Sequence, residues 1–91
     1  MLFRSDRDTA RAVAPTVSAM RAHAEQLRAD EVARFRGRLE GLDDRQVEAV
    51  EALTKGIVNK LLHAPTVRLK DAAGSTRGER LAAALRELFG L

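Results

Sequence analysis

Few residues of this sequence could carry out chemistry, and their spacing does not bring them together. The histidines, His23 and His63, lie far apart outside any HExxH pattern, and the chain has no cysteine to complete a metal site. Ser5, Ser18 and Ser75 lack the sequence context of a nucleophile elbow. The glycines form neither GxGxxG nor GxxxxGK[ST], the loops that bind nucleotide phosphates. The sequence therefore predicts no catalytic, cofactor-binding or metal-binding residue.

The acidic pairs and His63 fit helix ends better than they fit catalysis. Asp30–Glu31 and Asp43–Asp44 fall at expected helix or turn positions, where carboxylates usually cap or are solvated. His63 could act as a base or bind a phosphate. It also falls in the last turn of an expected helix, where a cation suits the helix dipole. We interpret His63 as a capping or interface residue.

A cluster of arginines could contact a polyanion such as tRNA. Arg34, Arg36 and Arg38 lie close together in a chain of net charge +3. Phe35 is the only aromatic residue among them, and the apolar pattern described below already accounts for it, so base stacking has little support. A solvated cationic face is the simpler interpretation, and nucleic-acid binding stays an open alternative.

The clearest pattern of the chain runs from Val47 to Lys70. Its apolar residues recur at steps of three and four, which places them on one face of an α-helix. Asp43 and Gln46 have the spacing of a capping box, so the helix is predicted to begin near Asp43. Pro65 is expected to end it at Ala64. The apolar face comprises Val47, Val50, Leu53, Ile57, Val58, Leu61 and Leu62.

The N-terminal part of the chain predicts a second long helix. Residues 1–9 have no clear periodicity and are expected to fray. From Ala10 the apolar residues follow the rhythm of a coiled-coil seam, which shifts by one position after Leu27. Because this spacing continues through Pro15, we expect one long helix there, with or without a kink. The seam comprises Val13, Val17, Met20, Ala24 and Leu27, continued by Arg28, Val32, Phe35 and Leu39.

The remaining segments are short. Gly37 and Gly41 mark a turn, and residues 66–72 could form either a short helix or an extended turn. Thr76 and Glu79 have the spacing of a capping box for a last helix, which Gly90 would end. No strand-like alternation is seen. The sequence thus predicts an all-α fold in which residues 1–91 form a single helical domain.

Composition favours self-association in the cytoplasm. The chain has three Phe but neither Trp nor Tyr, so its core must be thin. A domain of this size hides only about 60% of its unfolded surface, so pairing with another chain would add stability. No apolar run approaches the roughly 20 residues that cross a bilayer. The N-terminus also lacks a signal-peptide pattern.

Residues 51–70, EALTKGIVNKLLHAPTVRLK, resemble the C-terminal dimerisation domain of glutamyl-tRNA reductase. The family pattern reads Leu-Thr-x-x-Ile-Val-Asn-Lys-Leu-Leu-His-x-Pro-Thr-x-x-Leu-Lys, and this chain matches it from Leu53 to Lys70. A Pro-Thr-Val run at Pro15, the pair Glu31–Val32 and the ending ALRELFGL are also similar, so the resemblance covers about residues 12–91. The ending resembles that of actinobacterial-type members in particular.

This resemblance implies a long spinal helix and a V-shaped homodimer, or pairing with a full-length subunit. The parent enzyme uses NADPH to reduce glutamyl-tRNA to glutamate-1-semialdehyde in tetrapyrrole (porphyrin, haem) biosynthesis, through a thioester on a cysteine. This chain has no cysteine and no dinucleotide fingerprint, so we expect it to be inactive alone and to be a fragment or isolated domain. No catalytic residue of the family can be assigned to it, and no cofactor is expected in this chain.

The resemblance and the apolar pattern together predict which residues pack or form the dimer interface. Two alternatives stay open: a freestanding Arg-rich nucleic-acid-binding module, and a coiled-coil adaptor that pairs with another protein. The predicted interface or packing residues are Val13, Val17, Met20, Leu27, Phe35, Val50, Leu53, Ile57, Leu61 and Leu62.

Overall fold

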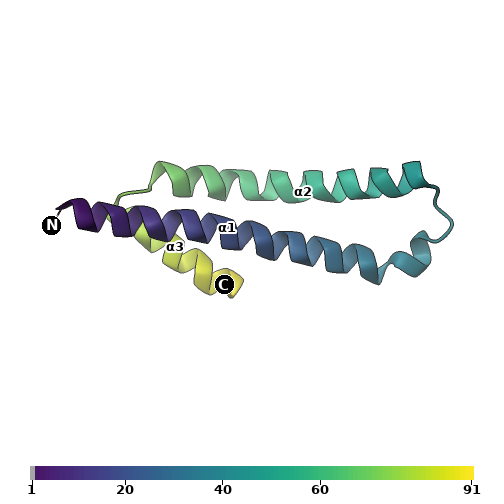
Figure 1. The fold of residues 1–91 in the computed structure, drawn as a ribbon, viewed down its shortest axis with the longest axis horizontal. Coiled ribbons are helices and arrows are strands. Elements are labelled where there is room, and N and C mark those ends of the chain that lie inside the picture. The colour runs from purple at the N-terminus through teal and green to yellow at the C-terminus, as the bar shows by residue number, and fades with distance from the viewer. Residues whose placement is uncertain (1) are drawn as a thin grey trace.

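The chain folds into a long helical hairpin with a third helix packed against one end (Figure 1). The computed structural model describes the backbone of residues 2–91 and the side chains of residues 13–91. Helix α1 spans Leu2–Arg34, the 3-10 helix η1 spans Arg36–Leu39, α2 spans Asp44–Asp71 and α3 spans Thr76–Phe89. The described backbone contains no strand, which confirms the all-α prediction.

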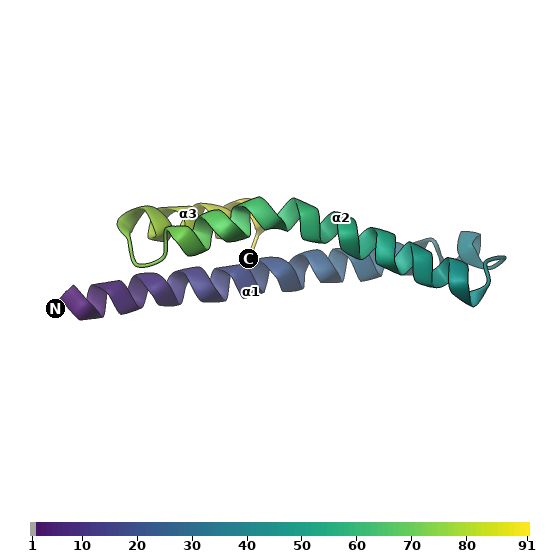
Figure 2. The same ribbon diagram turned by 90° about the horizontal axis from the view of Figure 1, so that it is seen from above.

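The hairpin is strongly elongated. Its principal extents are 60 × 20 × 15 Å, and its radius of gyration is 17.1 Å. A compact domain of this length would have a radius of gyration of about 12 Å. Helix α3 lies beside the N-terminal half of α1 and the C-terminal half of α2, and the opposite end is only two helices thick (Figures 1 and 2). The two ends therefore differ in how much apolar surface the chain itself can cover.

The core lies at the end that has three helices. Each of the three contributes buried side chains there, and Met20 is fully buried beside them. Among the described side chains, Thr16 is the buried polar one, and Arg86 of α3 donates a 2.8 Å hydrogen bond to its hydroxyl. The central cluster consists of Val13, Val17, Leu69 and Ala82, with Leu81 and Leu85 packed against it.

Helix α2 begins where the sequence predicts and ends later. The Asp43 carboxylate accepts a hydrogen bond from the Gln46 N–H, and the Gln46 side chain accepts one from the Asp43 N–H, which confirms the capping box. The expected end at Ala64 is wrong, because α2 continues through Pro65 to Asp71. Proline has a helical φ and removes one backbone hydrogen bond. Leu62 and Leu69, both buried, anchor the turns on either side of it.

Helix α1 is one long helix through Pro15, as predicted. It begins at Leu2. Fraying over residues 1–9 stays a prediction, since Met1 and the side chains of residues 2–12 lie outside the described part. The turn predicted at Gly37 and Gly41 is present as η1 and the turn after it. Among the described residues, no helix has the length and apolar content needed to cross a membrane.

The start of α3 differs from the prediction by one residue. Ser75, rather than Thr76, is the N-cap: its hydroxyl accepts a 3.1 Å hydrogen bond from the Gly78 N–H. The Ser75 hydroxyl also donates to the Ala72 carbonyl, which ties the loop to the end of α2. A Thr76–Glu79 capping box is therefore wrong. Gly90 ends α3 in the left-handed conformation, with φ 68°, as predicted.

Candidate interaction surface

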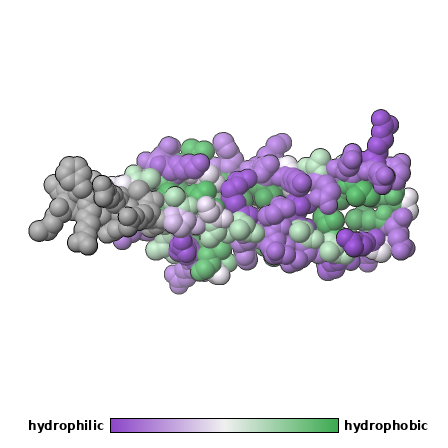
Figure 3. Space-filling model, in the orientation of Figure 1, coloured by the Kyte–Doolittle hydropathy of each residue, from purple (hydrophilic) through white to green (hydrophobic). Residues whose placement is uncertain are grey.

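An open apolar groove of about 830 Å³ runs between α1 and α2 beyond the end of α3. Phe89, in the last turn of α3, closes one end of the groove, and Leu39 of η1 lines the other. Figure 3 shows apolar surface between polar rows at the η1 end of the molecule. The apolar side chains that line the walls include Leu27, Val32 and Phe35 from α1 and its end, and Val50, Ile57, Val58 and Leu61 from α2.

The predicted interface or packing residues divide into two groups. Val13, Val17, Met20 and Leu62 are buried within the chain, because α3 and the end of α2 cover the first half of the α1 seam. They act as core residues of the subunit. The sequence could not separate them from the rest, since apolar residues recur at steps of three and four along the whole of both long helices.

The second group is left uncovered by the chain. Leu53, Ile57 and Leu61 are 64%, 51% and 70% exposed, respectively, although they form one apolar stripe on α2. Leu27 is also exposed, and Phe35 and Val50 are half-buried. No segment of the described chain covers Leu27, Leu53, Ile57 or Leu61. They are available to a partner.

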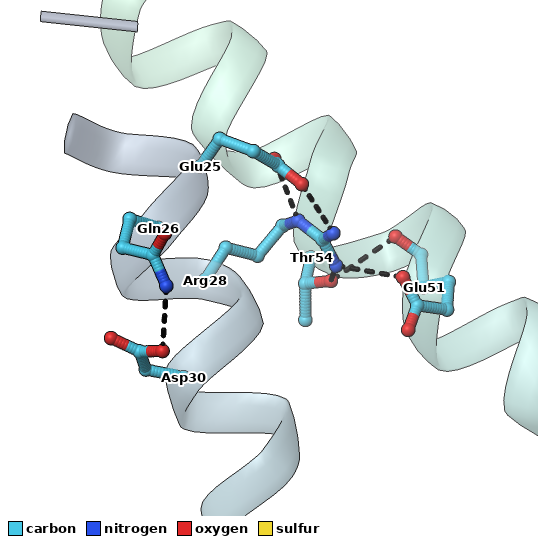
Figure 4. Close-up of polar contacts among 6 residues, drawn as sticks. All are labelled: Glu25, Gln26, Arg28, Asp30, Glu51 and Thr54. Carbon is cyan, nitrogen blue, oxygen red and sulfur yellow. Dashed lines mark hydrogen bonds and ion pairs between the residues drawn. The ribbon is translucent and has the colours of Figure 1, made fainter. Parts of the chain in front are cut away.

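Arg28 lines this groove, and its role there is not evident from the sequence. Its position fits the apolar seam of α1, but its hydrogen-bond partners lie on both α1 and α2, and residue spacing within one helix does not indicate them. Its side chain is only 8% exposed. It donates to both carboxylate oxygens of Glu25, to Glu51 across the hairpin at 2.8 Å, and to the Thr54 hydroxyl at 3.2 Å (Figure 4). The groove therefore has a single satisfied cation between apolar walls.

This network changes the ionisation of its members. The hydrogen bond from Arg28 lowers the pKa of Glu25 below its ordinary value of 4.5. The same hydrogen bond, together with the one to Glu51, raises the pKa of Arg28 above its already high range. Arg28 thus stays a cation, and the Glu25 carboxylate is held in the ionised form that accepts its N–H groups.

A second polar contact joins α1 and α2 nearer the core. Arg21 donates a 2.8 Å hydrogen bond to the side-chain oxygen of Asn59. Together with the Arg28–Glu51 pair, this contact fixes which face of α2 meets α1. The stripe containing Ile57 therefore lies at the open, exposed side of the groove and is not buried against α1.

The predicted tRNA-contacting arginines lie at the far end of the hairpin. The guanidinium carbons of Arg34 and Arg38 lie 4.5 and 5.1 Å from the centre of the Phe35 ring, and Arg34 also pairs with Glu31. Arg36 is exposed on η1. The three residues are close together, as the sequence indicates. Their contact with tRNA stays a prediction.

The two histidines lie in different surroundings. His63 is exposed and is not in the last turn of α2, since the helix continues to Asp71, so its predicted role in capping the C-terminus is wrong. His23 is half-buried and makes an edge-to-face contact with Phe89, with ring centres 6.2 Å apart. His23 thus helps to hold the end of α3 at the groove.

Comparison with known proteins identifies the class of domain. The family described as glutamyl-tRNAGlu reductase, dimerisation domain, matches residues 3–91. The glutamyl-tRNA reductase of Frankia alni is 54% identical over 86 residues, which are 94% of this chain and 18% of that protein. The protein of Streptomyces coelicolor is 48% identical over 79 residues, covering 87% of this chain and 14% of the relative.

A more distant relative matches along the whole chain. Glutamyl-tRNA reductase 2 of Anaeromyxobacter dehalogenans is 45% identical over 92 residues, which cover 100% of this chain and 20% of that protein. No solved structure matches the chain. The chain spans a fifth or less of the length of these relatives. Because the family match extends over almost every residue, this chain belongs to the glutamyl-tRNA reductase dimerisation-domain family.

Proposed function

We propose that this chain is a homodimerisation module of glutamyl-tRNA reductase and that the apolar face of the hairpin is its pairing surface. The observation that carries the proposal is the exposed stripe of Leu53, Ile57 and Leu61 beside an apolar groove that the chain leaves open. Contiguous apolar surface of this kind is characteristic of protein–protein interfaces. The family to which the chain belongs gives the pairing its context.

The physical argument concerns the thin end of the hairpin. Two packed helices bury the faces that meet, but they leave apolar residues on any other side exposed to water. Helical domains cover such residues by adding further helices. Helix α3 does so at one end of the molecule only (Figure 2). A second copy, or the equivalent hairpin of a full-length subunit, would complete the bundle at the other end.

The role in metabolism follows from the family by inference. The enzyme would be an NADPH-dependent oxidoreductase of tetrapyrrole biosynthesis acting in the cytoplasm, and this module would join two of its subunits. No residue of the chain is assigned to reduction or to binding NADPH. Its contribution would be to hold the subunits together.

The mass of the purified chain in solution tests the proposal. Light scattering coupled to gel filtration, across micromolar concentrations, should give twice the 10.0 kDa mass of one chain. Sedimentation velocity should give a single dimer species that dissociates on dilution. A monomer at every concentration would contradict the proposed function.

A second, weaker proposal concerns tRNA. Arg36 is exposed and has no ion pair among the described side chains, and Arg34 and Arg38 lie beside it. Such a cluster would contact phosphates, with an affinity that falls steeply as salt increases. Binding of tRNA by the chain, measured by filter retention, should weaken in Arg36→Glu at low salt. Equal retention of the variant would exclude the cluster.

A further inference from the structure

We propose that two copies pair through α2, antiparallel to each other, with the two-fold axis of the dimer passing beside Ile57. This inference rests on the proposed function and specifies the partner surface within it. In this arrangement, the apolar stripe of α2 packs against the same stripe of a second copy.

The first support is the arrangement of exposed apolar residues about Ile57. Leu53 lies four residues before it and Leu61 four residues after it, and each is more than half exposed. At about 100° per residue, both lie within about 40° of Ile57 around the helix. Val50 and Ala64, each seven residues from Ile57, fall on the same face. The stripe is therefore close to symmetric about its centre.

An antiparallel two-fold pair uses this symmetry directly. In such a pair, each residue meets the one equally far on the other side of the axis. Leu53 would then lie against the partner's Leu61, Ile57 against the partner's Ile57, and Val50 against the partner's Ala64. Every large apolar side chain of the stripe gains an apolar neighbour.

The second support is the distribution of charge along α2. Its beginning is acidic, with Asp43, Asp44, Glu48 and Glu51 against the single cation Arg45. From residue 52 to residue 70 there is no acid, and the charged residues are Lys55, Lys60, Arg68 and Lys70; the last residue of the helix, Asp71, is acidic. Antiparallel pairing places the acidic end of each helix beside the basic end of the other. Parallel pairing would place like charges together, which is unfavourable.

The third support is that the chain's own contacts leave the stripe open along its length. The Arg28–Glu51 and Arg21–Asn59 hydrogen bonds hold α1 against a different side of α2. A second apolar groove, of about 300 Å³, lies between α2 and α3 and is lined by residues that include Ala64, Arg68 and Leu88. Pro65 lines both grooves, so the apolar surface continues along α2 past Leu61.

Disulfide trapping can test the arrangement, because the chain has no cysteine of its own. The single variants are Ile57→Cys, Leu53→Cys and Leu61→Cys, with Ala52→Cys, on another side of α2, as the control. Each is first shown by light scattering, in reductant, to keep the mass of the wild type. Copper-catalysed oxidation followed by non-reducing gel electrophoresis then measures the covalent dimer.

The expected pattern is specific to an antiparallel pair centred on Ile57. Ile57→Cys should form at least several-fold more covalent dimer than Leu53→Cys, Leu61→Cys or Ala52→Cys alone. An equal mixture of Leu53→Cys and Leu61→Cys chains, unfolded and refolded together, should cross-link, because these positions face each other. If the Ile57→Cys chain is no longer a dimer in reductant, cross-linking is measured instead in an equal mixture of Val50→Cys and Ala64→Cys chains, because these positions also face each other.

The opposing outcomes are equally distinct. Self-cross-linking of Leu53→Cys and Leu61→Cys to the same extent as Ile57→Cys would indicate a parallel pair and overturn the inference. A dimer in which no stripe position cross-links would place the interface elsewhere and would also overturn it. A wild-type chain that is monomeric before any substitution would instead contradict the proposed function itself.

Discussion

The guanidinium of Arg28 on α1 donates a 2.8 Å hydrogen bond to the carboxylate of Glu51 on α2, and Arg28 also lines the apolar groove of the hairpin. The Arg28 side chain is almost completely enclosed, whereas Glu25 and Glu51 keep access to water. Arg28 is therefore the polar residue that fixes the two helices side by side where α3 does not reach. Its neighbours in the groove are mostly apolar.

Replacing Arg28 should destabilise the hairpin more than replacing an arginine that pairs only within its own helix. Arg28→Ala removes the hydrogen bonds from α1 to Glu51 and Thr54 of α2 as well as the packing of the side-chain methylenes. Arg34→Ala is the matched control, because Arg34 also pairs with a glutamate three residues earlier and is largely exposed. Because Arg34 is at the surface, Arg34→Ala should alter the free energy of unfolding by no more than about 0.5 kcal/mol.

Thermal unfolding followed by far-ultraviolet circular dichroism measures both variants. Arg28→Ala should lower Tm clearly and Arg34→Ala hardly at all. Equal Tm values for the two variants would mean that the contact between the helices adds nothing to the local ion pair.

The lowered pKa of Glu25 predicts a loss of stability in acid. Its pKa in the folded chain lies below the ordinary value of 4.5, because Arg28 hydrogen-bonds the carboxylate. The unfolded chain therefore binds this proton at a higher pH than the folded chain does. The stability that the ionised Glu25 carboxylate adds is fully present above pH 4.5, and it is lost as the pH falls through the pKa of the folded chain.

Measuring Tm of the wild type and of Glu25→Gln at several pH values isolates this contribution. The wild type should be the more stable at neutral pH, and the difference should shrink below pH 4.5. A difference between the two proteins that stays constant with pH would contradict the assignment.

The structure shows which features can be predicted from local sequence. The Asp43 cap and the Gly90 end depend on residues within one turn, and the sequence predicts both. The end of α2 depends on distant packing: burial of Leu62 and Leu69 carries the helix through Pro65. Ser75 is preferred to Thr76 as the cap because it also bonds the Ala72 carbonyl, a contact set by the loop.

The candidate site was only partly predictable for a similar reason. Val17 and Leu27 have equivalent places in the α1 seam, but one is buried and the other exposed. The difference arises from where α3 ends, and no spacing within α1 indicates this. The role of Arg28 likewise depends on Glu51 and Thr54, which the hairpin brings to it from another helix.

Gly78 is predicted to be intolerant of any side chain. A Cβ at this position would lie 2.1 Å from the Ala72 carbonyl oxygen, so the loop between α2 and α3 would have to move. We expect Gly78→Ala to destabilise the chain by about 1–3 kcal/mol, which is the range for overpacking. Gly56→Ala is the control, because nothing lies within 4 Å of its added Cβ.

The same substitution should thus have opposite effects at the two glycines. Gly56 is in the interior of α2, where alanine is favoured over glycine by up to about 1 kcal/mol. Urea unfolding measures the free energy of unfolding of Gly78→Ala and of Gly56→Ala. A Gly78→Ala chain as stable as the wild type would show that the loop shifts freely.

A charge on the apolar stripe of α2 should separate the dimer without unfolding the chain. Ile57 and Leu61 are both more than half exposed in the single subunit, so Ile57→Asp and Leu61→Asp should keep their helical content. In the dimer each carboxylate would enter an apolar interface, which costs several kcal/mol and should raise Kd by at least about 100-fold. Ala52→Asp is the control, since Ala52 is exposed on another side of α2.

The two variants should also differ from each other. If the two-fold axis passes beside Ile57, Ile57→Asp places two carboxylates against each other, whereas Leu61→Asp places each against the partner's Leu53. Repulsion between like charges adds to the cost of desolvation only in the first case. Sedimentation velocity over a dilution series should therefore give Kd values in the order Ile57→Asp, Leu61→Asp, Ala52→Asp, from weakest to tightest dimer. A stable dimer in both stripe variants would mean that another face of the hairpin pairs the subunits.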